Sequence, residues 1–437
     1  MAERVILFGV DGLDWSRLRA GVEAGILPNF ARLLETGAWA EVPVRASVPG
    51  LGGAESGMNS PTLWTTIATG QYYFQHGVYD FCNLLDSTDD PPLAESRHVR
   101  SPRIWDVLSE RGRASLVVGY YVTHPAYEIN GLMVSDLFAD TWDPAVVWPT
   151  SRRDELARVL GAENYADLLK SCGRDGKDAA QDAADDARYV ESARAALARF
   201  TDLSNERIDD MLGGRLEPRM SELIRYRLIQ PFLRDQAMQR IFLDELRDSA
   251  YEFATVYLRL IDFVGHGFWT EGLNLPQAFV ADYGPVVERA YQWIDERLGQ
   301  VRERIDDSDR LLVVSDHGFA AGREVHGFDD ASVVWDVSYG SHAEPAVLIA
   351  SGGAARGRVE DVSLLDLAPS ILDYFGIEQA DALDGGPVPG LLHRDAPRRL
   401  PRRDTYEFNH TEQTARLSDA DQHEIKARLK ALGYLRQ

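Results

Sequence analysis

Five side chains in this sequence are of the types that bind divalent metal ions, and they fall in three short motifs. Asp11 follows the apolar run RVILFGV, Asp262 and His266 lie in IDFVGHG, and Asp316 and His317 lie in SDHGF. Carboxylate oxygen and imidazole nitrogen are donors that zinc and manganese accept. An aspartate after a strand is often only a helix cap. Three such aspartates, two of them followed by a histidine one or four residues later, favour a metal site.

A hydroxyl-rich segment at 58–70, MNSPTLWTTIATG, offers candidate nucleophiles. Its hydroxyl side chains after Asn59 are Ser60, Thr62, Thr65, Thr66 and Thr69. A hydroxyl at a helix N-terminus that also touches a metal ion has its pKa lowered by the helix dipole and by the ion, which makes it able to attack phosphorus. Ser60 would equally serve as a helix cap with Pro61 at the first helical position, and the two roles are compatible. Composition alone does not choose among these hydroxyls.

The elements that must position these groups alternate between strand and helix patterns. Strand patterns cover 4–10, 115–121, 129–136, 252–262, 310–316 and 345–352, and helical spacing covers 27–37, 363–377 and 418–435. Buried apolar strands alternating with helices predict an α/β fold with a mostly parallel sheet, whose carboxyl ends carry the site.

The stretch from 145 to 248 has a different texture, because glycine and strand signals nearly vanish and apolar residues recur at spacings of three and four. This pattern predicts a helical insertion. Two interpretations remain open at this point: a cap over one end of the sheet, or a solvated helical spacer with no role in the site.

Composition excludes several classes of protein. The chain of 437 residues carries a formal net charge of −23, which argues against a nucleic-acid or anionic-membrane surface. Its two cysteines, Cys82 and Cys172, form neither a disulfide framework nor a thiolate metal site. The first residues lack the pattern of a signal peptide, and no apolar run reaches the length of about 18 residues that a transmembrane helix needs. We therefore expect a cytoplasmic protein without membrane insertion.

Five motifs in this order resemble those of the type I phosphodiesterase/nucleotide pyrophosphatase branch of the alkaline phosphatase superfamily. They are VDGLD, SPTLWTTIATGQYYFQHGVYDF, IDFVGHG, SDHGF and GSHAEPAVLIASG. The resemblance covers about 1–140 and 250–380. It implies an alkaline-phosphatase-like fold: a central, mostly parallel sheet flanked by helices, with the helical insertion as a cap. The implied domains are a catalytic domain from 1–144 and 249–395, the insertion 145–248, and a C-terminal extended segment and helix at 396–437.

The resemblance also implies two metal sites. In the family, one site takes an aspartate, the nucleophile and an Asp-His pair, which correspond here to Asp11, Ser60, Asp316 and His317. The other site takes the DxxxH pair and a late histidine, which correspond to Asp262, His266 and His342. His326 is the competing choice for the late ligand. His342 is preferred because it precedes a strand-like AVLIASG segment, as the family's histidine does.

Two further positions follow from the family pattern. The family's nucleophile stands ten residues before the glycine of the TG pair, and ten before Gly70 is Ser60, with Thr62 as runner-up. Nucleotide pyrophosphatases hold the phosphate with an asparagine shortly after the HG pair. Here Phe81 occupies that position and Asn83, the candidate substrate-binding residue, comes two residues later, which puts nucleotide specificity in doubt. Neither cysteine lies in a context that suits a sulfatase.

Together these observations predict a phosphoester hydrolase that depends on two divalent ions, with zinc favoured over manganese. The closest functional expectation is a phosphodiesterase/nucleotide pyrophosphatase-like enzyme that acts through a phosphoseryl intermediate on a small-molecule phosphate ester. A phosphomonoesterase or phosphomutase would use the same metal site, and a non-catalytic metal-binding protein is the third reading. The oligomeric state does not follow from the sequence.

Overall fold

The computed structural model describes most of the chain. The described residues are 4–49, 58–86, 90–141, 143–159, 179–212, 223–247, 250–322, 339–352, 355–392, 402–403, 417–431 and 435. Among them no helix combines the length and the apolar character that crossing a bilayer demands.

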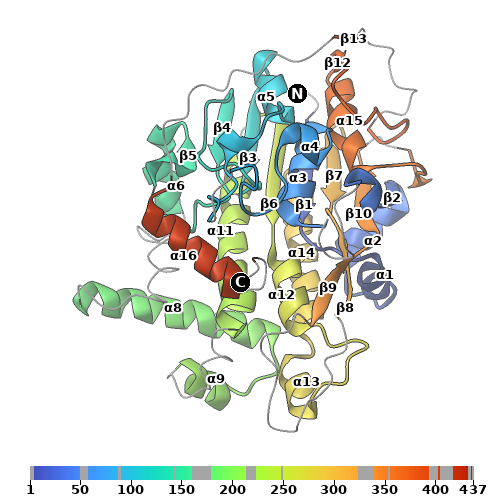
Figure 1. The fold of residues 1–437 in the computed structure, drawn as a ribbon. Coiled ribbons are helices and arrows are strands. Elements are labelled where there is room, and N and C mark those ends of the chain that lie inside the picture. Colours follow the sequence, from blue (N-terminus) through green and yellow to red (C-terminus); the bar gives the residue numbers. More distant parts are fainter. Residues whose placement is uncertain are drawn as a thin grey trace.

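A nine-stranded mixed sheet forms the centre of the fold (Figure 1), in the order β11-β2-β10-β7-β1-β6-β3-β4-β5. Its strands are β1 (Val5–Val10), β2 (Ala38–Val42), β3 (Ser115–Val118), β4 (Gly131–Val134), β5 (Val147–Trp148), β6 (Phe253–Leu258), β7 (Arg310–Val314), β10 (Ala346–Ser351) and β11 (Gly357–Arg358). The five neighbours from β7 to β4 are parallel, whereas β10 runs antiparallel to both β7 and β2. Parallel neighbours deliver their carboxyl ends to one edge, where α/β folds place their sites.

Helices cover both faces of this sheet. The principal ones are α1 (Trp15–Glu23), α2 (Pro28–Thr36), α3 (Ser60–Thr69), α4 (Tyr73–His76), α5 (Ile104–Glu110), α6 (Arg153–Val159), α8 (Ala179–Phe200), α9 (Asn205–Leu212), α11 (Gln230–Glu245), α12 (Leu260–Phe268), α13 (Gln277–Tyr283), α14 (Val286–Arg302), α15 (Leu367–Tyr374) and α16 (Asp419–Ala431). A π-helical turn, η5 (Arg225–Ile229), leads directly into α11. Two small strand pairs lie outside the main sheet. β8 (Gly318–Ala321) pairs with β9 (Gly340–Ala343) in antiparallel fashion, and β12 (Gln379–Ala380) pairs with β13 (Arg402–Arg403) in parallel fashion.

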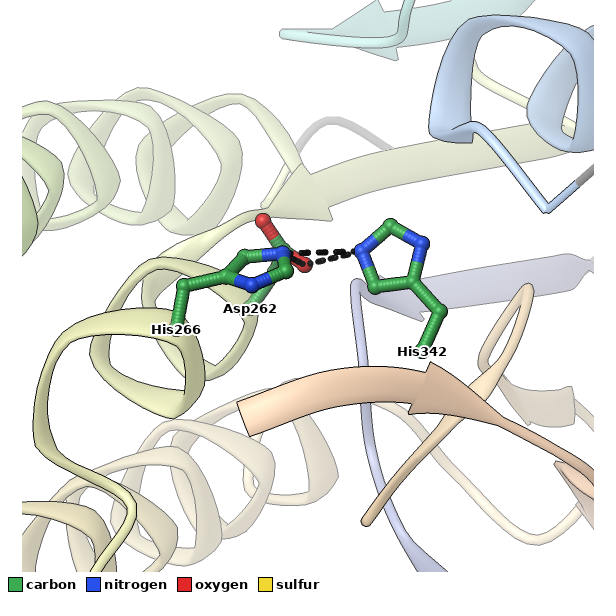
Figure 2. A group of neighbouring side chains, drawn as sticks. All are labelled: Asp262, His266 and His342. Atoms are coloured by element: carbon green, nitrogen blue, oxygen red, sulfur yellow. Dashed lines mark hydrogen bonds and ion pairs between the residues drawn. The ribbon is translucent and has the colours of Figure 1, made fainter. Parts of the chain in front are cut away.

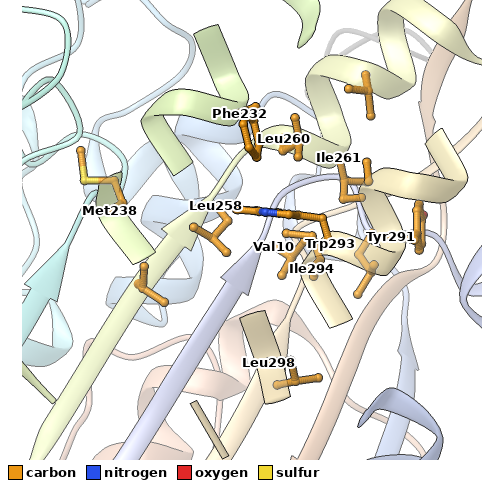
Figure 3. Packing of buried hydrophobic residues seen from close by; sticks show 14 of the residues in the cluster. Val10, Phe232, Met238, Leu258, Leu260, Ile261, Tyr291, Trp293, Ile294 and Leu298 are labelled. Atoms are coloured by element: carbon orange, nitrogen blue, oxygen red, sulfur yellow. The ribbon is translucent and has the colours of Figure 1, made fainter. Parts of the chain in front are cut away.

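The alternating side chains of β1 enter two separate cores. Val10, with Ile6 and Phe8, faces the core that α11, α12 and α14 cover, and Figure 3 shows Val10 packed with Trp293 and Ile294 of α14. Val5 and Leu7 face the opposite core, built with α3, α5 and α15. Every residue of β1 is buried, which explains why its sequence is one continuous apolar run, as expected for a central parallel strand.

Each predicted strand range is longer than the observed strand, and in two cases a local structure ends the strand early. The pattern at 115–121 stops at Val118, because Gly119 has a positive φ of 69° that breaks the extended backbone. The pattern at 252–262 stops at Leu258. The buried Asp235 carboxylate accepts the main-chain N–H groups of Arg259 and Leu260, both at 2.7 Å, and so begins α12. Asp262 therefore lies in the first turn of a helix and is not a strand-end residue.

The predicted 145–248 insertion contains helices with different surroundings. α11 packs along the sheet against β6 and β3, whereas α8 and α9 lie farther from the sheet (Figure 1). The short strand β5 in this range joins the sheet edge through β4. The division into domains remains a prediction from the sequence.

Candidate metal centre and nucleophile

The predicted ligands gather at the edge where β7, β1 and β6 end. Asp11 directly follows β1, and Asp316 and His317 follow its parallel neighbour β7. On the other side of β1, β6 leads into α12, where Asp262 and His266 are four residues apart and so share one helix face. These residues meet because they follow three adjacent parallel strands.

The first group consists of Asp11, Asp316 and His317. His317 Nε2 lies 3.2 Å from Asp11 Oδ1 and 3.5 Å from Asp316 Oδ2. One ligand atom of each residue lies within 4.8 Å of the others, and all three side chains are buried. This arrangement is compact enough for one ion to contact all three.

The second group consists of Asp262, His266 and His342 (Figure 2). Asp262 Oδ1 lies 3.2 Å from His266 Nε2 and 3.1 Å from His342 Nε2. His342 comes from β9, so a hairpin distant in sequence completes the group. The two groups adjoin, since His317 Nε2 is 3.9 Å from Asp262 Oδ1 and the rings of His317 and His342 stack with centroids 3.7 Å apart.

Main-chain carbonyl groups orient all three imidazoles. Nδ1 of His266 contacts the oxygen of Gly340 at 3.0 Å, Nδ1 of His317 that of Gly318 at 3.0 Å, and Nδ1 of His342 that of Met58 at 2.5 Å. A carbonyl oxygen can only accept, so each Nδ1 must carry the proton. Each ring therefore turns its Nε2 toward the centre, and in the neutral form this tautomer presents there the lone pair that a metal ligand needs.

The electrostatics of the centre are unfavourable without a cation. Burial raises the pKa of the Asp316 carboxyl well above its usual value, and the negative charge of Asp11 raises it further. Burial alone would also raise the pKa of Asp262, but His266 and His342 hold it well below the usual range. Burial lowers the pKa of His266 to about 4. Buried carboxylates beside imidazoles are a typical environment for divalent ions.

Several potential metal-ligand atoms lack the hydrogen-bond partners that buried polar groups normally have. Within the described part of the chain, Oδ2 of Asp316 and Nε2 of His317 make no hydrogen bond of good geometry although both residues are fully buried. Nε2 of His266 and Nε2 of His342 face each other at 2.9 Å, two lone pairs that repel unless a cation or proton lies between them. The residues present thus fit a pair of divalent ions.

Ser60 is the hydroxyl that reaches this centre. Its Oγ donates a hydrogen bond to Asp11 Oδ1 at 3.3 Å, and its side chain is buried at the first residue of α3. The helix cap is Asn59, whose side-chain oxygen accepts the Thr62 N–H at 3.1 Å. The expectation that Ser60 caps the helix, with Pro61 as first helical residue, was therefore wrong by one position. Because Asn59 satisfies the helix end, the Ser60 hydroxyl is left free to face Asp11.

Close packing against β1 fixes the position of α3. A Cβ atom at Gly9 would lie 2.9 Å from the ring of Trp64, so only glycine lets the helix approach this closely. Tyr120 adds a hydrogen bond from its hydroxyl to the Trp64 carbonyl oxygen at 2.9 Å. The helix N-terminus is thereby held over the carboxyl end of β1.

The other residues considered from the sequence make no described contact with the metal ligands. Thr62 is fully buried, and its Oγ1 has no hydrogen-bond partner among the described residues. Asn83 lies in the loop after α4, where its N–H donates to the Pro92 carbonyl oxygen at 2.7 Å; no contact joins it to the ligands in the described structure. His326 and Cys172 lie outside the described residues.

Tyr257 is a site residue that sequence reasoning missed. Its hydroxyl, on β6, donates a short hydrogen bond to Asp11 Oδ2, while Ser60 bonds the other oxygen. Burial, followed by the charge of Asp11, raises the pKa of Tyr257 well above its usual value, so the hydroxyl stays protonated as a donor. A tyrosine in the apolar run FATVYL is typical of core packing, and no pattern in the sequence singles it out.

Known proteins resemble this chain in sequence and in fold. The family model for type I phosphodiesterase / nucleotide pyrophosphatase matches residues 5–351. A 2,3-bisphosphoglycerate-independent phosphoglycerate mutase of Haloarcula marismortui is 28% identical over 196 residues, which is 43% of this chain and 31% of that protein. A second such mutase, of Herpetosiphon aurantiacus, is 26% identical over 164 residues, 36% of this chain and 27% of that protein. The chain thus matches about a third of the length of these relatives.

Among solved structures, the wild-type alkaline phosphatase PafA superposes with a TM-score of 0.53 at 13% identity, covering 90% of this chain and 99% of PafA. This similarity, at so low an identity, concerns the fold and confirms the predicted α/β architecture of a mostly parallel sheet flanked by helices. The family model spans far more than half of the sequence and includes β1, α3, α12 and the SDHGF segment. The chain belongs to the type I phosphodiesterase / nucleotide pyrophosphatase family.

Proposed function

We propose that this protein is a two-metal-dependent phosphoester hydrolase that acts through a phosphoseryl intermediate, with phosphodiesters as the preferred substrates. One observation carries the proposal: two three-residue ligand groups adjoin, and a buried serine hydroxyl contacts the first of them at Asp11. Membership of the phosphodiesterase family supports the same conclusion.

The ligand groups suggest how the ions would be held. Asp11, Asp316, His317 and the Ser60 hydroxyl would hold one ion, and Asp262, His266 and His342 the other. Two divalent ions against three carboxylates leave a net positive charge, which offsets the acidity of the chain as a whole and attracts a phosphate ester. The mixed oxygen and nitrogen donors favour zinc, with manganese as the alternative.

When bound, such ions lower the pKa of a coordinated hydroxyl and neutralise charge on the phosphoryl oxygens. The chain itself supplies the nucleophile and its orientation. Asp11 accepts the Ser60 hydrogen bond through Oδ1, and Tyr257 fixes the carboxylate through Oδ2. Ser60 Oγ would attack phosphorus in line with the departing ester oxygen. The positive end of the α3 helix dipole would stabilise negative charge on the phosphoryl oxygens. Water then cleaves the phosphoseryl bond and regenerates Ser60.

A phosphomonoesterase or phosphomutase with the same centre is the second candidate. The similarity to two phosphoglycerate mutases favours it, although the match spans only about a third of their length. A mutase passes the phosphoryl group from the serine to a second hydroxyl of the substrate, whereas a hydrolase passes it to water. A non-catalytic metal-binding protein is the third candidate.

Metal analysis and turnover separate these candidates. We expect purified protein to contain about two divalent ions per chain, removed by a chelator together with activity. Metal-loaded protein should hydrolyse bis-(p-nitrophenyl) phosphate faster than p-nitrophenyl phosphate, and Ser60→Ala should abolish turnover while still binding metal. Faster turnover of the monoester would favour the second candidate. Absence of metal affinity in folded protein would refute the central claim. Metal binding without turnover of any ester would favour the third candidate, a non-catalytic metal-binding protein.

A further inference from the structure

A pocket beside the metal centre has an apolar and aromatic lining that the proposed chemistry does not account for. Its walls include Pro61, Phe81, Tyr121, Phe263 and Leu429. We propose that this pocket receives an apolar alkyl or aryl substituent of the substrate ester. The inference rests on the proposed function and names the substrate class for that site.

Three walls of the pocket adjoin catalytic groups. Pro61 follows Ser60 on α3, and Phe263 follows Asp262 on α12. Tyr121 packs on Tyr257 with ring centroids 4.9 Å apart, and Tyr257 in turn contacts Asp11. A phosphoryl group at Ser60 would therefore place one of its substituents at the mouth of this pocket.

The charged residues of the lining are already engaged by the protein. Asp136 accepts main-chain N–H groups of Val122, Thr123 and His124 at 3.0–3.2 Å. Arg259 pairs with Asp140 across 3.7 Å, and its guanidinium stacks over Phe263 at 5.1 Å. These are the charged groups that the described lining contains.

Besides these charged groups the lining contains the polar side chains of Tyr121, Tyr226 and Gln230, and its ten other residues are apolar. Most of the surface left for a ligand is therefore apolar. A nucleoside base would need donors and acceptors for its edges, and these are costly to leave unmet in a buried site. An alkyl or aryl group has no such requirement. The lining therefore favours an apolar substituent over a nucleoside.

One wall comes from a part of the chain beyond the matched family region. Ile425 and Leu429 of α16 line the pocket, and Leu417 and Ile425 pack with Cys82 and Leu93 in a small separate core. The Lys426 Nζ donates to Asp90 at 2.7 Å and ties the helix to the same loop. Figure 1 shows α16 crossing this side of the molecule. The match to the family model ends at residue 351, so this wall lies outside the matched region and suits a role in specificity.

The size of the pocket limits the substituent. The cavity has a volume of about 80 Å³. One water needs roughly 10–15 Å³, so there is room for about five to eight groups the size of a methylene. Burying one methylene is worth about 0.8 kcal/mol, which corresponds to about fourfold in affinity. Affinity should therefore rise with chain length and level off near six carbons.

Calorimetric titration of metal-loaded protein with methyl- to octylphosphonate tests this inference. We expect two- to fourfold tighter binding for each added methylene up to about six carbons. Ala94→Phe, which fills the pocket from a partly exposed wall, and Leu429→Asp, which charges the α16 wall, should flatten this series and leave methylphosphonate affinity unchanged. Ala427→Asp, at an exposed position of the same helix, is the matched control and should keep the wild-type slope.

The outcomes separate this inference from the proposed function. If methylphosphonate binds but affinity does not depend on chain length, or if both pocket variants keep the wild-type slope, the pocket assignment is wrong and the metal centre stands. If adenosine 5′-monophosphate binds more tightly than hexylphosphonate, the apolar assignment is also wrong. If no phosphonate of any length binds metal-loaded, folded protein, the proposed function fails and the pocket assignment with it.

Discussion

Removal of the Asp235 carboxylate should destabilise both the fold and the metal centre. This buried side chain ends β6 and begins α12 by accepting the N–H groups of Arg259 and Leu260 at 2.7 Å. It also accepts a hydrogen bond from Arg234 Nη1 at 3.0 Å, and the Arg234 side chain is only 1% exposed. Asp235→Ala therefore leaves a buried guanidinium without its counter-ion and two helix N–H groups without an acceptor.

The structure sets the magnitude of this effect. Breaking a buried ion pair from one side costs about 3–5 kcal/mol, because the remaining charge is uncompensated. Arg234 keeps two carbonyl partners, Gly119 at 2.8 Å and Tyr257 at 3.0 Å, which places the loss toward the lower end of this range. The two orphaned N–H groups add about 1 kcal/mol each, the low end for an unsatisfied buried donor, for a total of about 5 kcal/mol. With an unfolding entropy of about 0.9 kcal/mol/K for 437 residues, the midpoint of thermal unfolding should fall by about 5 °C.

Differential scanning calorimetry of metal-free protein measures this shift, and chelator competition measures the accompanying loss of metal affinity at Asp262. Asp244→Ala, on the same helix but partly exposed, should change the midpoint by no more than about 1 °C. The double variant Arg234→Met/Asp235→Leu removes both charges and should recover at least half of the loss. If Asp235→Ala unfolds at the same temperature as Asp244→Ala, or if the double variant is the least stable, the reasoning about this carboxylate is refuted.

Three further outcomes are expected. Ser60→Ala should lower kcat by at least about 10³-fold while Thr62→Val stays within about tenfold of wild type, and equal losses in steady-state assays would argue against Ser60 as the nucleophile. Tyr257→Phe should weaken metal binding by about 10–100-fold in chelator competition, because Asp11 loses the hydrogen-bond donor that fixes its second oxygen. Unchanged metal affinity would mean that Tyr257 contributes only to packing. Burial lowers the pKa of His76 from 6.5 to about 3, so the unfolded chain takes up a proton that the folded chain refuses. Stability should thus fall by about 1.4 kcal/mol per pH unit between pH 6.5 and 3, and His76→Gln should lose less on acidification in thermal scans at pH 7 and 4.5.

The regular parts of the fold and the ligand types follow from local sequence signals. β1 and β7 are short apolar runs. Asp11 directly follows the end of β1, and Asp316 comes two residues after the end of β7. The DxxxH spacing brings Asp262 and His266 to one face, because residues four apart are neighbours on a helix. These features depend on residues close together in the sequence.

What the sequence did not reveal depends on residues far apart. The end of β6 is set by Asp235, which lies 24 residues before Arg259 and whose type says nothing of its partner. Asn59 and Ser60 are both good helix caps, and the choice between them is made by the contact of Ser60 with Asp11, 49 residues away. Tyr257 and the α16 wall of the pocket are tertiary contacts of the same kind. The hydrophobic periodicity of strands and helices, two and 3.6 residues, does not indicate which distant residues will be in contact.

The main-chain anchors of the three imidazoles bear on how this centre tolerates change. The Nδ1 atoms of His266, His317 and His342 are held by carbonyl groups, which every residue type provides. Replacing the side chain of Met58 therefore does not by itself remove an anchor. At Gly340 and Gly318, by contrast, a Cβ atom would lie 2.5 Å and 2.8 Å from a main-chain oxygen, so any other residue there would displace the backbone. Side chains of the adjoining pocket can then diversify while the ligand geometry persists. This separation makes the pocket walls, and α16 in particular, the part of the molecule where new substrate preferences would be selected or engineered.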